Sequence, residues 1–322
     1  MISLTALLQW LAPWATAQEA TAQEATAEAG APQQSLGGGL ASPRLWSIEA
    51  PAPGPDGQRG SLHLLGAIHV GPPGGWIFAP QVEQAFSQAE VLVVEVDLEE
   101  HSAEERDATT LSRGLLATHE SLGERIPPEL YQELRAHLAA TGQPIMGLDR
   151  LEPWMVAIAL SAREIERAGY SPESGVDLQL MQRARGQKEI VGLETAREQL
   201  EMLDGLPPEL QALMLKEVLR HPEEMRSYFE QLMQAWRRGD QPALEELVFR
   251  ELDGHPELAP FYEAVIFQRN EAMAKGLAEL LGSGRPLFAV IGAAHLAGER
   301  GIPARLRALG LRVEAVPAVS PH

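Results

Sequence analysis

The sequence predicts an α/β or α+β protein, with a central, mainly parallel or mixed sheet flanked by helices and a helical insertion before the last strands. Three observations carry this prediction. From residue 45 onward, short apolar runs alternate with segments of helical periodicity. The run at 91–96 is β-branched and apolar on both faces, as a buried parallel strand is. The stretch 195–281 contains no convincing strand, so we expect consecutive helices there.

The expected strands share short, apolar, mostly β-branched runs that are bounded by Gly, Pro or polar residues. They lie at 45–48, 62–68, 91–96, 144–148, 189–193, 287–291 and 311–316. A short helix is expected at 79–89, with Pro80 in its first turn. The segment 151–168 repeats apolar residues every three or four positions, which predicts an amphipathic helix.

The beginning of the chain is expected to lie outside the folded domain. Residues 1–17 are largely apolar and end in a small-x-small pattern at Ala17, which suits signal-peptidase cleavage, although the first basic residue is Arg44. The alternative is a disordered tail with a fortuitously apolar start. Residues 18–43 are of low complexity and predict a flexible linker, which leaves 44–317 as a single domain. We therefore expect an exported protein, periplasmic or secreted.

Composition excludes several classes of function. The chain has 26 basic and 45 acidic residues, a formal net charge of −19, which argues against binding to nucleic acid or to anionic membrane surfaces. Cysteine is absent, so a metal ion would have to be held by His, Asp and Glu. No apolar run approaches the roughly 20 residues that span a bilayer, so no transmembrane segment is expected.

Side chains capable of chemistry follow several of the expected strands. His69 and His295 each end a Gly-x-x-His motif that follows an apolar run, and Glu95 lies within the run at 91–96. Asp149 and Glu194 come directly after two further runs. Ligands of open α/β sheets bind outside the carboxyl ends of the strands. Imidazoles and carboxylates together are donors for Zn²⁺, Mn²⁺ or Co²⁺.

Each of these residues also has a purely structural interpretation. A histidine at the end of a strand can be satisfied by a backbone carbonyl, and a third Gly-x-x-His, ending at His63, precedes its strand and is not expected to join a site. Glu95 requires a cation, a hydrogen-bond network or an edge position facing water, because an unpaired buried carboxylate is costly. Asp149 and Glu194 can act as helix caps or first-turn acids.

Three more polar residues stand where helices are expected to begin. Asp177 follows Gly175-Val176 and can open a helix at 177–184. Arg269 and Asn270 open an amphipathic helix. A guanidinium can hold a substrate carboxylate or stabilise an oxyanion, although a structural salt bridge is its commoner role.

Six short motifs in order extend this pattern. They are Gly66-Ala67-Ile68-His69, Val93-Val94-Glu95-Val96-Asp97, Gly175-Val176-Asp177, Gly192-Leu193-Glu194-Thr195, Arg269-Asn270 and Gly292-Ala293-Ala294-His295. As an ordered set spanning roughly 45–317, they resemble the TraB/PrgY/GumN family, which includes the animal Tiki proteins. The resemblance implies a fold similar to the erythromycin-esterase/ChaN-like group. The second Gly-x-x-His departs from the family's commoner Gly-x-Gly-His.

The resemblance also implies an activity. Tiki proteins are described as metal-dependent proteases, so it implies a metal-dependent hydrolase, of the peptidase type, that acts on a peptide or protein with Mn²⁺, Co²⁺ or Zn²⁺. His69, His295 and Glu95 would hold the metal, and Glu95 would also accept the proton of the metal-bound water.

The remaining candidates would support that chemistry. Arg269 and Glu194 would take part in catalysis, and Asp177, Asn270 and Asp149 would orient the substrate or the ligands. Two rival hypotheses stay open. One is a non-catalytic protein that binds a peptide or small ligand without turnover. The other is an esterase-like hydrolase that uses a His/Glu pair without a metal.

Overall fold

The computed structural model describes residues 40–317 except 56, 98–102 and 221. The expected signal segment 1–17 and most of the expected linker 18–43 lie outside the described residues. The first described residues already pack against the domain, because Ala41 is buried and forms a β-bridge with Phe78. The packed part of the chain therefore starts before residue 44.

A six-stranded mixed sheet lies at the centre of the fold, in the order β4-β3-β5-β2-β1-β6. Its strands are β1 (Leu45–Pro53), β2 (Arg59–Ala67), β3 (Val91–Val94), β4 (Glu189–Gly192), β5 (Pro286–Gly292) and β6 (Arg312–Ala315). The neighbours β4, β3, β5 and β2 are parallel, whereas β1 is antiparallel to both β2 and β6. The predicted α/β class with a central mixed sheet is confirmed.

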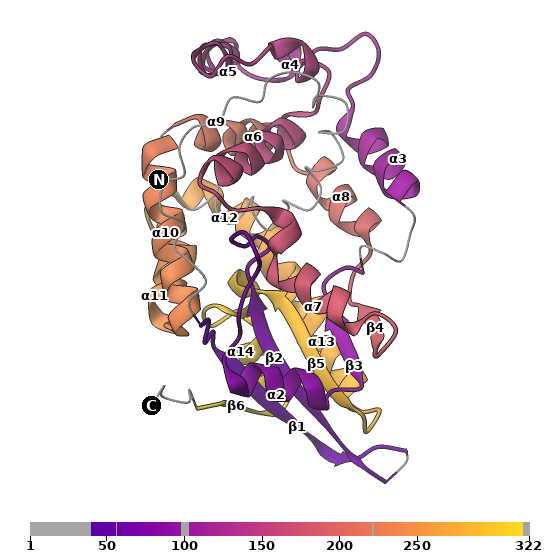
Figure 1. Ribbon diagram of the computed structural model, residues 1–322. Helices are drawn as coiled ribbons and strands as arrows, with labels where there is room; N and C mark the ends of the chain where they lie inside the picture. The colour runs from indigo at the N-terminus through magenta and orange to yellow at the C-terminus, as the bar shows by residue number, and fades with distance from the viewer. Residues whose placement is uncertain (1–39, 56, 98–102, 221, 318–322) are drawn as a thin grey trace.

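Helices cover both faces of this sheet. α2 (Pro80–Gln88) lies on one face, and α13 (Gln268–Leu281) and α14 (Ile302–Ala308) lie on the other (Figure 1). Successive residues of β5 alternate between the two faces, as strand geometry requires: Phe288 packs in the cluster with α2, and Ala289 in the cluster with α13. A strand buried on both faces is expected to be continuously apolar, which explains the composition of β3 and β5.

The other helices gather at one end of the sheet (Figure 1). They are α3 (Ala103–Gly114), α4 (Leu122–Arg125), α5 (Pro128–Ala140), α6 (Pro153–Arg167), α7 (Val176–Ala184), α8 (Ala196–Asp204), α9 (Pro208–Arg220), α10 (Pro222–Arg238), α11 (Gln241–Gly254) and α12 (Ala259–Tyr262). The described part of 195–281 contains no strand, as predicted, and a π-helical turn, Glu263–Phe267, joins α12 to α13. None of the described helices combines the length and apolarity needed to cross a bilayer.

The expected strand at 144–148 is wrong. Residues Ile145–Gly147 form a single 3-10 turn. Met146 is 80% exposed, so the apolar side chains of this run do not form a buried strand. Asp149 consequently does not follow a strand. Its carboxylate accepts a 2.8 Å hydrogen bond from the hydroxyl of Tyr131 on α5.

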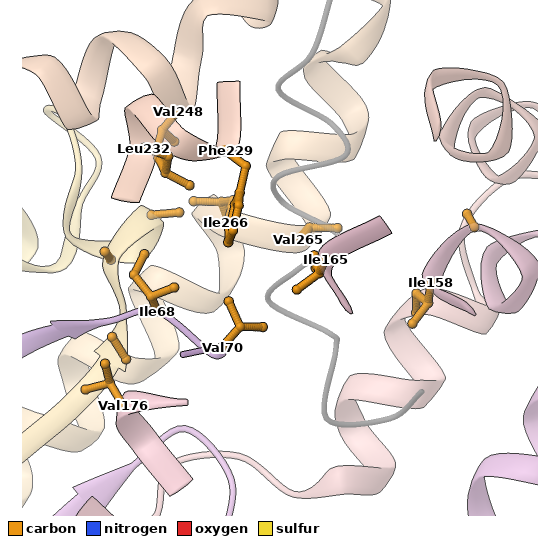
Figure 2. Close-up of a cluster of buried hydrophobic side chains, with 14 of the residues drawn as sticks. Ile68, Val70, Ile158, Ile165, Val176, Phe229, Leu232, Val248, Val265 and Ile266 are labelled. Carbon is orange, nitrogen blue, oxygen red and sulfur yellow. The ribbon is translucent and has the colours of Figure 1, made fainter. Parts of the chain in front are cut away.

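A buried apolar cluster anchors the segments that carry the candidate residues (Figure 2). Its members neighbour those residues in the sequence or come from the surrounding helices. Ile68, Val70, Val176, Val265 and Ile266 neighbour candidate residues, and Phe229, Leu232 and Val248 come from α10 and α11. Ile68 and Val70 lie on either side of His69, and both are at most 3% exposed. Packing therefore restrains the backbone at the site before any polar contact is made.

The chain just after His69 lies against the chain just before Asp177. Gly71 and Ser171 exchange two backbone hydrogen bonds of 2.9 Å, and the N–H of Val176 donates to the carbonyl of Ile68 at 2.9 Å. A Cβ atom at Gly71 would lie 2.0 Å from the carbonyl oxygen of Ser174, so only glycine permits this approach.

We predict that Gly71→Ala lowers the free energy of unfolding by about 1 to 3 kcal/mol, because the backbone must separate to admit the methyl group. Gly147→Ala is the matched control, since a Cβ there meets nothing within 4 Å and the effect should stay within about 0.5 kcal/mol. Denaturant unfolding of both variants measures the difference. Equal stabilities would show that this contact is not tight.

Candidate functional site

The order of the parallel strands places four candidate side chains side by side at the carboxyl edge of the sheet. Glu194 follows β4, Glu95 follows β3, His295 lies in the turn after β5, and His69 follows β2. Neighbouring parallel strands end at the same edge, so residues that are far apart in sequence meet there. Arg269 reaches the same place from the first turn of α13.

His69 is paired with Asp177, the second residue of α7. The Nδ1 atom of His69 lies 2.9 Å from Oδ2 of Asp177, and its Nε2 atom lies 3.8 Å from Oε1 of Glu95. A carboxylate on Nδ1 favours the tautomer that keeps the proton there and leaves the Nε2 lone pair directed toward Glu95.

The two carboxylates also set the protonation of His69. Burial by itself would lower the pKa of His69, but the negative charges of Asp177 and Glu95 outweigh burial and the opposing charge of Arg269, and the pKa is raised. His69 is therefore a stronger base than a free imidazole.

Every N–H group of Arg269 has a hydrogen-bond partner. Its Nε atom lies 3.0 Å from both carboxylate oxygens of Glu194, and its Nη2 atom lies 2.7 Å from Oε2 of Glu194 and 2.7 Å from Oε2 of Glu95. Its Nη1 atom lies 3.1 Å from the carbonyl of Val265 and 3.1 Å from Nε2 of His295. A guanidinium has five N–H donors, and these contacts engage all of them. The expected role of holding a substrate or an oxyanion is not supported by this arrangement.

Glu95 is ionised and fixed in place. Its Oε2 atom accepts from Arg269, and its Oε1 atom accepts a 2.6 Å hydrogen bond from the backbone N–H of Gly292. Burial by itself would raise the pKa of Glu95, but its proximity to His295, Arg269 and His69, together with the hydrogen bond from the Gly292 N–H, lowers its pKa to about 2. Of the three interpretations of Glu95, the structure shows two together, a cation and a hydrogen-bond network.

His295 is a neutral imidazole with a defined tautomer. A guanidinium can only donate, so Nε2 of His295 accepts from Arg269 through its lone pair. Nδ1 therefore carries the proton and donates to Oδ1 of Asn270 at 2.6 Å, while Nδ2 of Asn270 donates to the carbonyl of Arg300 at 2.9 Å. Burial lowers the pKa of His295 to about 3, because burial together with the charges of Arg269 and His69 outweighs the attraction of Glu95.

Little of the cluster is exposed. His295 and Asn270 have no exposed surface, whereas His69, Glu95, Asp177 and Arg269 each keep 7–9% of theirs. Both ring nitrogens of His69 are themselves buried.

The structure brings together all but one of the candidate residues. The assembled residues are His69, Glu95, Asp177, Glu194, Arg269, Asn270 and His295. Asp149 is not among them, since its carboxylate binds Tyr131 instead. His63 lies within β2, opposite Ser47 of β1 and Phe288 of β5, and takes no part.

The network contains further groups that were not among the candidates, and the sequence gives no signal for two of them. The carbonyl of Val265 and the N–H of Gly292 are backbone groups, whose direction depends on the fold. A third, Gln199, donates a 3.1 Å hydrogen bond to Glu194 and follows it by five residues, a spacing that brings a first-turn side chain of α8 back toward the preceding loop.

The expected metal site of His69, His295 and Glu95 does not fit this arrangement. Within the described residues, no three His, Asp or Glu side chains are grouped so that they could hold a metal ion. The physical reason is the position of Arg269, whose guanidinium contacts both Nε2 of His295 and Oε2 of Glu95. Two of the atoms that would bind the metal are thus already bound to a permanent cation.

The fold and the site together define a class: an α/β protein with a buried histidine–carboxylate–arginine cluster at the carboxyl edge of its parallel strands. Comparison with known proteins narrows this further. The model of the TraB/PrgY/gumN family matches residues 45–315, which is most of the chain, and the protein belongs to that family. The resemblance seen in the ordered motifs is confirmed.

Two relatives illustrate the range of the family. The chain is 30% identical to the YbaP protein of Escherichia coli (strain K12) over 248 residues, which cover 76% of this chain and 88% of that protein. It is 25% identical to the metalloprotease TIKI1 of Danio rerio over 334 positions, which cover 86% of this chain and 64% of that protein. No solved structure matches the chain, so the expected likeness to the erythromycin-esterase/ChaN group stays a prediction.

We predict that Asp177→Asn lowers the free energy of unfolding by about 1 to 3 kcal/mol at pH 6, because it removes a hydrogen bond between charged groups. A histidine whose pKa is raised by folding adds stability below its unfolded pKa of about 6.5 and loses this stability as the pH rises through the folded pKa. The cost of Asp177→Asn should therefore be smaller at pH 9 than at pH 6. Urea unfolding at both values tests this, and an effect independent of pH would contradict it.

Proposed function

We propose that the protein is a hydrolase in which His69 activates a water molecule. The observation that supports this proposal most directly is the His69–Asp177 pair, in which Nε2 of His69 lies 3.8 Å from a carboxylate oxygen of Glu95. A water molecule between these two acceptors can donate one hydrogen to each. An imidazole that is oriented by a carboxylate is an effective general base, and the raised pKa of His69 makes it a stronger proton acceptor.

In the proposed reaction, Nε2 of His69 accepts a proton from the water as the oxygen attacks the substrate carbonyl. The imidazolium formed is stabilised by Asp177 on Nδ1, and it returns the proton to the leaving group as the carbonyl re-forms. Glu95 does not change its protonation state, because its pKa of about 2 keeps it ionised. It orients the water and adds negative charge that favours the imidazolium.

Arg269 has a supporting role in this proposal. It holds Glu95 and Glu194 and compensates their charges, without which two buried carboxylates would repel each other and take up protons. Asn270 and His295 continue the same network into the interior. These residues position the reacting groups and do not touch the substrate.

The substrate class rests on similarity. TIKI1 is named a metalloprotease, so a peptide bond is the proposed target here as well. Because the proposed step needs only an electrophilic carbonyl, esters are a second class worth assaying. Export to the periplasm or medium, proposed from the apolar start of the chain, would place peptides and proteins of that compartment within reach.

We predict that His69→Gln and Glu95→Gln each reduce kcat/KM by about 10²- to 10⁴-fold, the usual contribution of a positioned proton acceptor and its partner. The assay incubates the full chain with a defined peptide mixture and identifies products by mass spectrometry. His63→Gln is the control, because His63 also ends a Gly-x-x-His motif but lies in β2 away from the cluster. It should retain at least half of the activity.

Two outcomes would count against the hydrolase. Saturable peptide binding with no product would favour the rival hypothesis of a binding protein. Equal losses in His69→Gln and His63→Gln would show that the His69–Asp177 pair has no special part in the reaction.

We also predict that activity survives dialysis against EDTA and is not increased by Mn²⁺ or Co²⁺, because Arg269 already supplies the positive charge at Glu95 and His295. Rates before and after dialysis, together with the metal content of the protein, test this. Loss of activity with EDTA and its return with Mn²⁺ or Co²⁺ would instead support the metal-dependent mechanism that the name of TIKI1 suggests.

A further inference from the structure

We infer that Arg269 is the built-in cation of this site, that His295 is consequently no metal ligand in this chain, and that removal of the guanidinium would create a site for a divalent cation. The expectation drawn from the family resemblance is different, because it makes the histidine of the second Gly-x-x-His motif a metal ligand. The difference lies in the contacts of one side chain.

The first step concerns the lone pair of His295. Its Nδ1 atom is engaged by Asn270, whose amide is in turn oriented by the carbonyl of Arg300, so the proton of the ring stays on Nδ1. The only lone pair of the neutral ring is then on Nε2, and it is directed at Nη1 of Arg269, 3.1 Å away. A metal ion needs this same lone pair.

The second step concerns the carboxylate oxygen. Oε2 of Glu95 lies 3.8 Å from Nε2 of His295 and 2.7 Å from Nη2 of Arg269. A metal ion bound to both Nε2 and Oε2 at the usual distance of about 2.0–2.2 Å would lie between them, where the guanidinium makes its own contacts with the same two atoms. Two cations cannot occupy that space.

The third step concerns the stability of the arginine. All five of its N–H groups have partners, two of which are carboxylates, and the side chain is only 9–10% exposed. Displacement by a metal ion would break its bonds to His295 and Glu95, and the guanidinium cannot lose its charge to reduce the cost.

The fourth step follows from the groups that would remain. Without the guanidinium, Glu95, Glu194 and His295 would surround a cavity with two negative charges and one imidazole, all in their present backbone positions. This is a donor set that Mn²⁺, Co²⁺ and Zn²⁺ accept.

The test measures Co²⁺ binding by equilibrium dialysis and visible absorption on the full chain, without any substrate. We compare the wild type with His295→Gln, Arg269→Ala and the double variant. Arg183→Ala is the control, because it removes an arginine from an exposed pair with Glu83 outside the cluster. We expect Arg269→Ala to bind about one Co²⁺ per chain at least tenfold more tightly than the wild type, and this binding to be lost in the double variant. Arg183→Ala should behave as the wild type does.

Several results would overturn the inference. The first is a wild type that binds one Co²⁺ per chain and loses at least tenfold in affinity in His295→Gln. Another is a folded Arg269→Ala that gains no Co²⁺ affinity, which would show that the guanidinium is not what keeps metal out.

If Arg269→Ala fails to fold, ¹⁵N NMR of the wild-type imidazoles tests the inference instead. Nε2 of His295 should give the signal of an unprotonated nitrogen, and this signal should stay unchanged when Zn²⁺ is added. A change on addition of Zn²⁺ would overturn the inference. Because none of these measurements involves turnover, the inference and the proposed hydrolase can fail separately.

Discussion

Glu95 and Arg269 place opposite charges in a region from which water is almost excluded. Their nitrogen and oxygen atoms lie 2.7 Å apart, and each residue is less than 10% exposed. Burying such charges costs several kcal/mol per ion, and the cost is offset only if every donor and acceptor finds a partner. The other contacts of the cluster follow from this requirement: Glu194, Val265 and His295 take the remaining N–H groups of Arg269.

This constraint explains why the two histidines differ. His295 faces a guanidinium, so it must be neutral, and it lies fully buried. His69 faces two carboxylates, Asp177 and Glu95, and its pKa is raised. Two residues from the same Gly-x-x-His pattern thus acquire opposite proton affinities from their neighbours. In the proposed reaction only His69 exchanges a proton, and His295 serves the network behind it.

Much of this fold could be predicted from the sequence, because buried parallel strands have a distinctive composition. β3 and β5 are nearly continuous apolar runs, and the residues that follow them are the polar exceptions. The run at 144–148 looked similar but is exposed at Met146, and apolar composition alone cannot distinguish a short buried strand from a surface turn.

The contacts within the site could be predicted only in part. The rule that parallel strands end at one edge predicted four members of the cluster, His69, Glu95, Glu194 and His295. The same rule failed for Asp149, because that residue follows no strand. The order β4-β3-β5-β2 is what brings Glu95 between Glu194 and His295, and strand order has no local signature in the sequence. A structural salt bridge was one of the roles expected for Arg269, but its partners could not be predicted, because they depend on which groups the fold places around its five N–H groups.

The wide turn at Glu263–Phe267 has a consequence for how this chain can change over evolutionary time. A π-helical turn contains one residue more than an α-helical turn needs, and such turns recur near functional sites. Each residue of an α-helix advances the direction of the side chain by roughly 100°. The wide turn absorbs about one such step, so deletion of one residue there would restore regular helix and leave Arg269 facing nearly the same way. The length of this turn is therefore less strictly constrained than the identity of the arginine that follows it.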